Sequence, residues 1–519
     1  MGHGKEISIA EERSLPRRRL RMRCMAISLV VWSALFAGCA TSPLRERPWL
    51  IGTSPRFEVF STMEEAEVVE LLTELERFHA LIYFLTGLDP VDPPVPTRIY
   101  AFARTSDYRV AGGAKKTVGQ FVAGLRSNTI LLADDGRLMS AKQVVFHEYV
   151  HFLLRNGSQL KYPVWYDEGF AELLSTVRVE DDVVVIGTIP AVRANSIRYF
   201  DWIDLEYVVG AAGYSDFSAS NRHLLYAESW ALVHYLLLDR GSERSIHEDL
   251  NRYLERRRLG SSATSAFESA FGESLAGLDR EIPRLLRKGV RLVGVPESEL
   301  DYDRSPPLVQ PASAVDAALL LGQLRLKGRD WADAEEDFRT AITLAPSNPR
   351  AQAGLGDVLK FRNDFVDAER YFERAIELGP EDPLNWIDFA EFLHDRSRTM
   401  EDPQGRRELL ARAREAYVRA LELQPNSAEA WVMLGRTHLE PGENPELARE
   451  PTEKAYGLLP SARTTLFSLA ELQIALGHER QAVELLIRAF GDTGDADTLE
   501  QVSAWIKSVR AHRAKVSGP

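Results

Sequence analysis

A residue pattern that repeats every 34 positions in the C-terminal half is the strongest constraint on the fold. The first two copies share a glycine, alanines, a phenylalanine and a proline, at Gly322, Ala334, Phe338, Ala341 and Pro346, and again at Gly356, Ala368, Phe372, Ala375 and Pro380. Small residues let paired helices approach closely, the aromatic residue fills the seam between them, and proline ends each unit. The period therefore predicts a stack of helix pairs.

Later copies of this pattern extend the stack toward the C-terminus. The third contains Trp386 and ends at Pro425, the fourth runs from Trp431 to Pro460, and a fifth begins at Leu466. The pattern resembles the tetratricopeptide repeat, and the resemblance implies an all-α solenoid of about five repeats over residues 313–510. An unrelated helical bundle is the alternative.

The expected groove of the solenoid is mixed in charge. Basic residues alternate with acidic ones there, namely Arg325, Lys327 and Arg362 with Asp357, Asp388 and Glu391. Surfaces of stacked repeats bind peptides or partner proteins, so we expect a protein partner in the groove. The mixed charge does not select one class of ligand.

The N-terminus has the layout of an export signal. A basic stretch at residues 17–23 precedes an apolar stretch at residues 25–38, which is followed by Cys39. The apolar stretch is too short to cross a bilayer comfortably as a permanent helix, which favours a cleaved signal. An ordinary signal peptide or an uncleaved signal anchor remains the alternative to a lipoprotein signal.

Residues 35–39, with the sequence LFAGC, resemble a bacterial lipobox, although Phe36 departs from the usual leucine. The resemblance implies a lipoprotein signal peptide over residues 1–39 that ends at the lipidated Cys39, followed by a tether over residues 40–55. Because Ala40 is not aspartate, it implies a lipid anchor in the outer membrane of the bacterial cell envelope, facing the periplasm. Several acyl chains on one cysteine would hold the protein stably to the membrane.

Length and charge limit the classes of partner. A chain of 519 residues is long enough for two or three domains with separate cores. The formal net charge of -13 argues against a nucleic-acid binder, because phosphate binding requires a clustered basic face. The two cysteines, Cys24 and Cys39, both lie near the N-terminus, so a metal site in the folded part must use histidine and carboxylate ligands.

The region between the tether and the repeats has the pattern of a mixed α+β domain. Short β-type runs are expected at residues 57–60, 97–102, 119–124 and 129–133, and a helix at residues 63–85. The pattern is then mostly helical to about Gly289, interrupted by a hairpin at residues 177–186. We expect this domain over residues 56–290 and a proline-rich interdomain linker over residues 291–312.

A motif of the HExxH type lies in an otherwise apolar segment at residues 144–154. Residues four apart lie on one face of a helix, so His147 and His151 can both reach a single zinc ion. Glu148 is then placed beside a water molecule bound to the metal. Because such a pattern also arises by chance, the motif needs a third ligand nearby before it indicates a zinc site.

A second acidic motif follows at residues 163–172, with the sequence PVWYDEGFAE. Glu168 can supply the third protein ligand of a catalytic zinc site, which leaves one position open for water. Glu172 lies one helical turn further on and can accept a hydrogen bond from a ligating imidazole, which would fix its tautomer. The alternative is that both glutamates belong to a solvated helix face.

Together these two motifs resemble the gluzincin metallopeptidases, the group that includes thermolysin and the aminopeptidase N-like enzymes. The resemblance covers about residues 56–289 and is strongest over residues 144–174. It implies a zincin-type fold and one Zn²⁺ held by His147, His151 and Glu168. It also implies that Glu148 is the general base.

In the aminopeptidase-like branch, a tyrosine near the start of a later helix stabilises the oxyanion, and residues 225–237 resemble that helix. Tyr226 takes the matching position, although it can be a simple core residue, and His223 and Tyr235 are rivals for the role. The family's G-x-M-E-N segment, which grips a substrate's free amine, is absent from the sequence. The resemblance therefore favours an endopeptidase over an aminopeptidase.

These features predict a membrane-anchored zinc metallopeptidase whose repeats recruit a peptide or protein substrate or a partner. The strand at residues 119–124 is either an edge that pairs with an extended substrate or an ordinary sheet strand. A non-catalytic envelope scaffold that acts through its repeats is the main alternative, and a hydrolase of non-peptide amides is another. A degenerate site would be expected to have lost one of its four central residues, and all four are present.

Overall fold

The computed structural model describes residues 43–88, 95–113, 118–133, 138–157, 162–199, 202–211, 216–218, 221–240, 246–490 and 496–514. The predicted signal segment, with Cys39, lies outside the described residues. A short 3-10 turn, η1 (Pro43–Glu46), belongs to a first unit of residues 1–46, and residues 47–519 form a second compact unit. Within the described ranges we find no helix with the length and apolar character needed to cross a membrane.

A six-stranded mixed sheet in the order β4-β5-β3-β2-β1-β9 supports the N-terminal half. Its strands are β1 (Leu50–Thr53), β2 (Phe57–Ser61), β3 (Thr97–Phe102), β4 (Gly119–Val122), β5 (Asn128–Ala133) and β9 (Leu308–Pro311). The central strands β2, β3 and β5 are parallel, while β4 pairs antiparallel to β5. Every residue of β5 is buried, as expected for a parallel strand covered on both faces. Strand β4 is left at one edge of the sheet.

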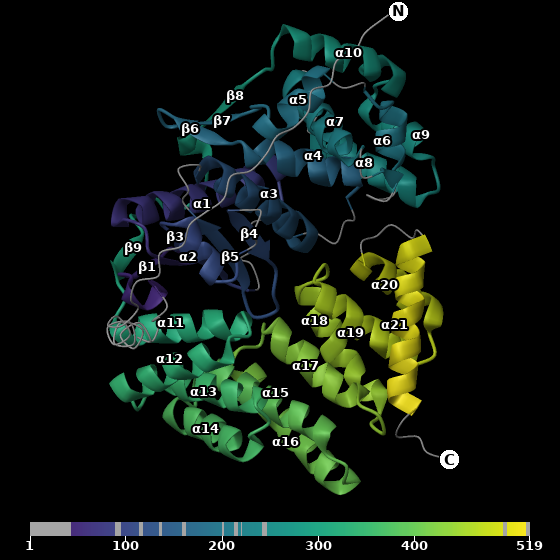
Figure 1. The fold of residues 1–519 in the computed structure, drawn as a ribbon. Coiled ribbons are helices and arrows are strands. Elements are labelled where there is room, and N and C mark those ends of the chain that lie inside the picture. Colours follow the sequence, from purple (N-terminus) through teal and green to yellow (C-terminus); the bar gives the residue numbers. More distant parts are fainter. Residues whose placement is uncertain are drawn as a thin grey trace, which may run out of the picture. The chain divides into compact units, whose positions relative to one another are not determined.

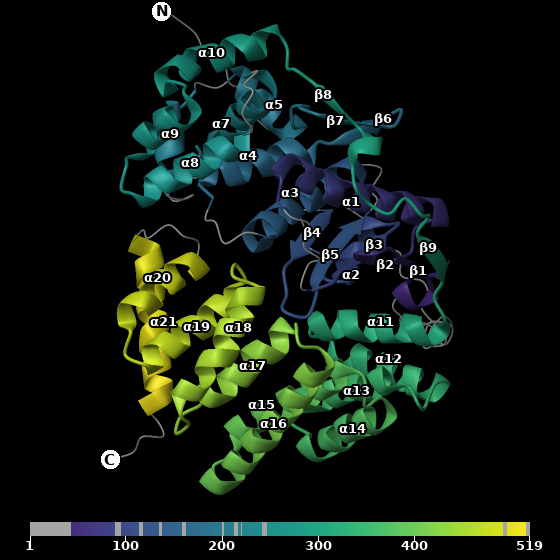
Figure 2. The ribbon, with the colours of Figure 1, turned by 180° about the vertical axis from the view of Figure 1, so that it is seen from behind.

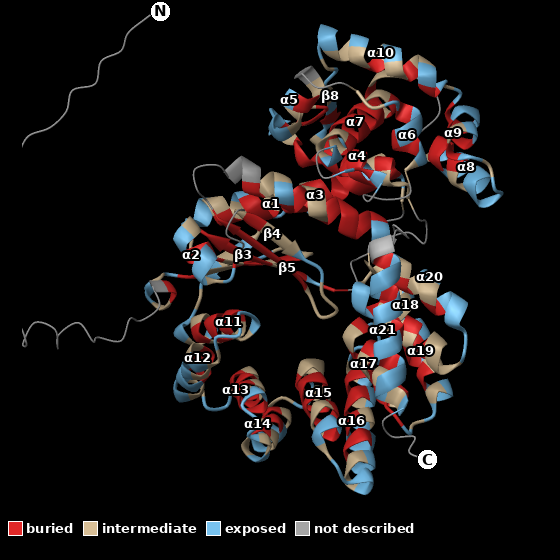
Figure 3. Ribbon diagram, turned by 45° about the vertical axis from the view of Figure 1, so that its right-hand side comes forward, coloured by how far each residue is buried: buried red, intermediate tan, exposed pale blue. Residues whose placement is uncertain are grey.

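Four helices carry the largest share of the core beside this sheet (Figure 1): α1 (Glu65–Thr86), α3 (Leu138–Gly157), α4 (Val164–Ser175) and α7 (Arg222–His234). Helices α1 and α3 meet through the stacked rings of Phe78 and Phe146, whose centroids lie 3.9 Å apart. Helix α4 contacts both α3 and α7. Figure 3 shows α3, α4 and α7 largely buried.

The remaining elements of this half surround those four helices. A small antiparallel sheet consists of β6 (Arg178–Glu180), β7 (Val183–Ile186) and β8 (Val293–Pro296). The other helical elements are α2 (Thr105–Val110), α5 (Ala191–Tyr199), α6 (Leu205–Gly210), the π-helix η3 (Tyr235–Asp239), α8 (Ile246–Arg258), α9 (Ala263–Phe271), α10 (Leu275–Lys288) and the 3-10 turn η4 (Glu297–Glu299). The expected α+β domain is therefore present.

The boundaries of this domain differ from the predicted ones. The proposed linker, residues 291–312, contains β8, which pairs with β7, and β9, which pairs with β1. The proposed tether, residues 40–55, likewise contains β1. Strands β8 and β9 each end in a proline and lie at a sheet edge, where a missing backbone N–H does not break the ladder. Because proline is typical of loops and rare inside strands, the proline-rich sequence of residues 291–312 favours a linker over two strands.

The C-terminal half is a solenoid of five helix pairs followed by one more helix, stacked in chain order (Figures 1 and 2). The pairs are α11 (Ala314–Lys327) with α12 (Trp331–Leu344), α13 (Pro349–Phe361) with α14 (Phe365–Leu378), α15 (Pro383–Thr399) with α16 (Pro403–Leu423), α17 (Ala428–Leu439) with η5 (Pro445–Ala448) and α18 (Arg449–Leu458), and α19 (Arg463–Ala475) with α20 (Glu479–Phe490); α21 (Ala496–Ala514) ends the stack. Phe338 fills the seam so closely that a Cβ on Gly354 would lie 2.2 Å from its ring. The described residues thus form five helix pairs, and the count of five repeats stays a prediction.

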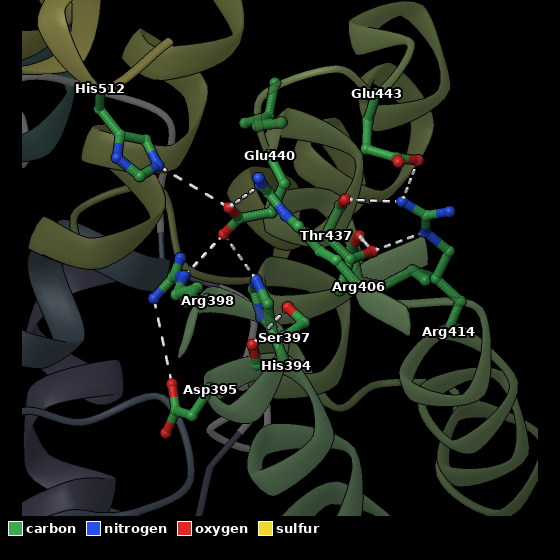
Figure 4. Close-up of polar contacts among 12 residues, drawn as sticks. His394, Asp395, Ser397, Arg398, Arg406, Arg414, Thr437, Glu440, Glu443 and His512 are labelled. Carbon is green, nitrogen blue, oxygen red and sulfur yellow. Dashed lines mark hydrogen bonds and ion pairs between the residues drawn. The ribbon is translucent and has the colours of Figure 1, made fainter. Parts of the chain in front are cut away.

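A buried carboxylate, Glu440, joins four elements of the solenoid (Figure 4). It accepts hydrogen bonds from Arg398 of α15 at 2.7 Å and Arg406 of α16 at 3.2 Å, and lies 2.9 Å from His394 and 3.7 Å from His512 of α21. Burial alone would raise the pKa of Glu440, but the hydrogen bonds and positive charges around it lower that pKa to about 2. The cluster fixes the last helix against the middle repeats.

Candidate metal centre and active-site cleft

Helix α3 places two imidazoles on one face, one turn apart. The Nε2 atoms of His147 and His151 lie 3.1 Å from each other. Glu168 of α4 reaches both from the side, with Oε2 3.3 Å from Nε2 of His147 and Oε1 3.3 Å from Nε2 of His151. Among the residues that the structure describes, these three form the one group of His, Cys, Asp and Glu side chains that could hold a metal ion.

The spacing of these atoms fits a zinc ion. Nitrogen and oxygen ligands lie about 2.0–2.1 Å from zinc, so the corners of a tetrahedral site are about 3.3–3.4 Å apart. The separation of 3.1 Å between the two Nε2 atoms is close to that edge length, and each Nε2 lies 3.3 Å from a different oxygen of the Glu168 carboxylate. Three nitrogen and oxygen ligands also leave a fourth corner for water. The predicted ligands therefore converge, and the zinc itself stays a prediction.

Helix α4 is buried on nearly all sides, and so are the three carboxylates that it carries. Asp167, Glu168 and Glu172 are 8%, 2% and 4% exposed, which excludes the alternative of a solvated helix face. A buried charge needs partners, and each of the three has them. Burial would raise the pKa of Glu168, but hydrogen bonds from His147 and His151 outweigh it and hold that pKa well below its ordinary value.

Asp167 orients one of the ligands, a role that the sequence did not predict. Its Oδ1 lies 3.0 Å from Nδ1 of His151, on the side of the ring away from the metal position, and its Oδ2 accepts from Nε of Arg155 at 3.0 Å. Burial lowers the pKa of His151, but the negative charge of Asp167 and its hydrogen bond raise it to about 10. Binding of a metal at Nε2 would therefore release a proton.

Glu172, predicted to orient an imidazole, is near the other histidine. Its Oε1 lies 3.7 Å from Nδ1 of His147, which is too long for a direct hydrogen bond. The same oxygen accepts from Nη2 of Arg193 at 2.7 Å. Arg193 thus holds Glu172 beside His147. The predicted hydrogen bond from a ligating imidazole to Glu172 is not formed, and the carboxylate of Glu172 lies near that imidazole instead.

Tyr226 of α7 comes to the site because α4 and α7 pack backbone to backbone. A Cβ on Gly169 would lie 2.2 Å from the carbonyl oxygen of Ser229, so only glycine allows this approach. The ring of Tyr226 lies 6.5 Å from that of His147, and the guanidinium of Arg193 covers its face at 4.5 Å. Its rival Tyr235 is directed instead to Glu273, at 3.4 Å.

The hydroxyl of Tyr226 is protonated at neutral pH. Burial is the largest cause that raises its pKa, and the negative charge of Glu168 adds to it, giving a value of about 12. A protonated phenol can donate a hydrogen bond, which is what the predicted role requires. The geometry therefore allows Tyr226 to act as an oxyanion donor, and the role stays a prediction.

A cleft of about 300 Å³ opens beside the metal position. Glu148 and His151 contribute to its lining, as do Phe121 of the edge strand β4 and residues 123–125 of the loop after it. The turn between α18 and α19 contributes Leu459 and residues 461–462, and the start of α19 contributes residues 463–464. The cleft is therefore built jointly by the α+β domain and the repeats.

Ionic contacts hold the repeats against the α+β domain. Arg126, in the loop between β4 and β5, reaches Asp388 of α15 at 2.8 Å and Glu429 of α17 at 2.7 Å. Asp388 is also paired with Arg350 at 2.9 Å. Asp388 was expected to line an open groove, but its carboxylate forms ion pairs with two arginines of the same chain.

The comparisons with known proteins concern this C-terminal half. The family model described as a tetratricopeptide repeat matches residues 319–383 and 405–463. The C-terminal half contains tetratricopeptide repeats. The sequence prediction of these repeats is confirmed, and repeats of this type generally mediate contacts between proteins. No curated protein matches the chain.

The chain is also similar to several solved structures. A tetratricopeptide-repeat protein of Thermus thermophilus is 20% identical and covers 38% of this chain and 99% of its own length, with a TM-score of 0.33. PilF of Pseudomonas aeruginosa is 20% identical, covers 39% of this chain and 88% of its own, with a TM-score of 0.30. The type IV pilus biogenesis factor PilW is 17% identical, covers 40% and 89%, and has a TM-score of 0.32.

Three arginine and aspartate residues of the site escaped the sequence analysis. Asp167 precedes the third ligand in the same motif, and a second carboxylate in an apolar helix is the signal that could have found it. Arg155, one turn after His151, had no signal beyond that spacing. Arg193 lies in α5, which no motif marks, so only the packing of α5 beside α7 brings it to the site.

Proposed function

We propose that this chain is a zinc-dependent hydrolase that cleaves peptide bonds within a chain, anchored to the bacterial envelope through Cys39 and presenting repeats that bind its substrate or a partner. The observation that supports this most is the convergence of His147, His151 and Glu168, whose ligand atoms lie within 4.8 Å of one another, with Glu148 lining the adjoining cleft. A structural zinc site is closed by four protein ligands, whereas three ligands beside an open cleft suit catalysis.

A zinc ion held by these ligands would polarise the scissile carbonyl and acidify a water molecule. Glu148, which lines the cleft, would take a proton from the attacking water and deliver it to the leaving amine. Tyr226 would donate its hydroxyl proton in a hydrogen bond to the developing oxyanion. Arg193 and Glu172 keep that tyrosine in place from behind.

The edge strand β4 supports the assignment of an extended peptide as substrate. Among the described strands it pairs only with β5, so we propose that its other side adds a substrate strand by backbone hydrogen bonds. Phe121, in this strand, lines the same cleft as Glu148. A peptide bound along β4 would pass the catalytic side chains without needing a free terminus there.

The test is a comparison of two variants in the purified chain without its signal segment. Glu148→Gln is expected to retain one equivalent of zinc by metal analysis but to lose cleavage of a library of internally quenched peptides. His151→Ala is expected to lose both the zinc and the cleavage. A Glu148→Gln variant that cleaves as fast as the parent would overturn the proposed role of Glu148.

A second candidate is a non-catalytic adaptor that acts through its repeats. The family match, which lies within the repeats, favours this candidate. An adaptor would bind its partner with or without metal and would cleave no peptide. Cleavage of amide-linked non-peptide compounds, with peptides left intact, would instead indicate a hydrolase of another substrate class.

A further inference from the structure

The wall of the cleft that comes from the repeats is fixed in place. Leu459, in the turn between α18 and α19, is 1% exposed and belongs to the hydrophobic core of the α+β domain. The hydroxyl of Ser461 donates to Oδ1 of Asn156, in α3, at 2.8 Å. Because this turn is held by both apolar packing and a hydrogen bond to the catalytic helix, the residues that follow it have a defined position beside the cleft.

Arg463 follows this turn, lines the cleft and is exposed. Its guanidinium lies over two aromatic rings, those of Phe467 and Phe490, at 5.3 Å from each centroid. In the described part of the chain, no carboxylate forms an ion pair with it. Arg155, the other arginine of the cleft, is by contrast held by Asp167.

The chemistry of Arg463 selects a ligand group. A guanidinium beside aromatic rings keeps its fork of N–H donors, which suits a carboxylate that accepts two parallel hydrogen bonds. Part of the cleft lining is apolar, including Phe121, Leu125 and Phe152. The cleft thus combines apolar lining with one positive charge on its repeat wall that no described carboxylate pairs with.

We propose that Arg463 binds a carboxylate of the substrate, so that the tetratricopeptide repeats form part of the specificity site. The carboxylate is either an acidic side chain or the C-terminus of the peptide. This inference rests on the proposed hydrolase function for its role in cleavage, but the binding of the carboxylate can be measured separately.

The experiment uses matched peptides and three forms of the chain without its signal segment. The peptides are pairs from the quenched library that differ only by glutamate or glutamine at one position, or by a free or amidated C-terminus. Cleavage is measured with the parent, Arg463→Gln and Arg480→Gln, and binding of fluorescein-labelled versions is measured in a Glu148→Gln background. Arg480 is the control because it lies on the same repeat but is 94% exposed and does not line the cleft.

We expect the parent and Arg480→Gln to prefer the carboxylate member of one set of pairs by about tenfold in kcat/KM and in binding, as one charge-assisted hydrogen-bonded pair implies. Arg463→Gln should abolish the preference. Preference within the glutamate pairs identifies a side chain, and preference within the free-terminus pairs identifies the C-terminus.

The failures of the two proposals are distinguishable. Glu148-dependent cleavage with no carboxylate preference, or with a preference that Arg463→Gln retains, overturns the role of Arg463 and leaves the hydrolase standing. Carboxylate-selective binding that needs Arg463, without any cleavage by the parent, supports the carboxylate site and overturns the hydrolase. If the parent shows neither a binding preference for the carboxylate nor cleavage, both proposals are overturned.

Discussion

Substitution of Asp167 by asparagine should weaken zinc binding without removing a ligand. The carboxylate lies 3.0 Å from Nδ1 of His151 and is buried, so it holds the proton on that nitrogen and leaves Nε2 as the nitrogen that gives up its proton to bind the metal. Asparagine keeps the shape of the side chain but loses the negative charge. The oxygen of its amide can still accept, which makes the loss partial.

The expected magnitude follows from what such supporting carboxylates contribute elsewhere. Loss of a hydrogen-bonded partner of a ligating histidine typically reduces metal affinity about 10–100-fold. That range corresponds to about 1.4–2.7 kcal/mol. Because the Asp167 contact is direct and its side chain is buried, we expect Asp167→Asn to fall toward the upper half of this range.

A matched control separates orientation of the histidine from the ion pair of Asp167. Arg155→Gln removes the partner on Oδ2 but keeps the contact between Oδ1 and His151. The side chain of Arg155 is 43% exposed, so its ion pair contributes little, and this variant should change zinc affinity less than about threefold.

The assay is a titration of the metal-free chain with zinc against a chelating dye at constant pH, with thermal unfolding followed by circular dichroism to verify that each variant is folded. If Asp167→Asn binds zinc within twofold of the parent, Asp167 does not tune the ligand and the reasoning fails. If Arg155→Gln weakens zinc as much as Asp167→Asn does, the effect comes from the ion pair.

Three further predictions concern packing and charge. Arg126→Gln should lower the free energy of unfolding in urea by about 2 kcal/mol, because it removes two charge-assisted hydrogen bonds to the repeats, and an unchanged urea midpoint would contradict this. The pKa of Glu440 is lowered from 4.5 to about 2, so its charged form should stabilise the fold by about 3 kcal/mol above pH 5. This contribution should be lost as the pH falls toward 2. The difference in Tm between the parent and Glu440→Gln should therefore shrink between pH 5 and pH 2. Gly169→Ala should force α4 and α7 apart at Ser229, costing about 1–3 kcal/mol in thermal stability and slowing peptide cleavage by displacing Tyr226, and an unaltered Tm would argue against the close approach.

The sequence determined those features that depend on the local geometry of a helix. A period of 34 residues with small residues at fixed places is sufficient to indicate paired helices, and the family match and the structure agree with it. Two histidines four residues apart must share a helix face, so their meeting follows from the spacing alone. Glu168 could be predicted because it lies in a second apolar helix close along the chain.

Only the tertiary structure decided the contacts between segments that are distant in sequence. The pairing of β9 with β1 turned the expected linker into sheet, and a proline at a strand end concealed it. Arg193 reaches the metal site and Arg463 reaches the cleft through the packing of helices. Arg126 reaches the groove of the repeats from a loop. No local period in the sequence encodes these contacts. A repeating pattern specifies which face of a helix is buried, but which partner covers that face depends on how all the elements pack together.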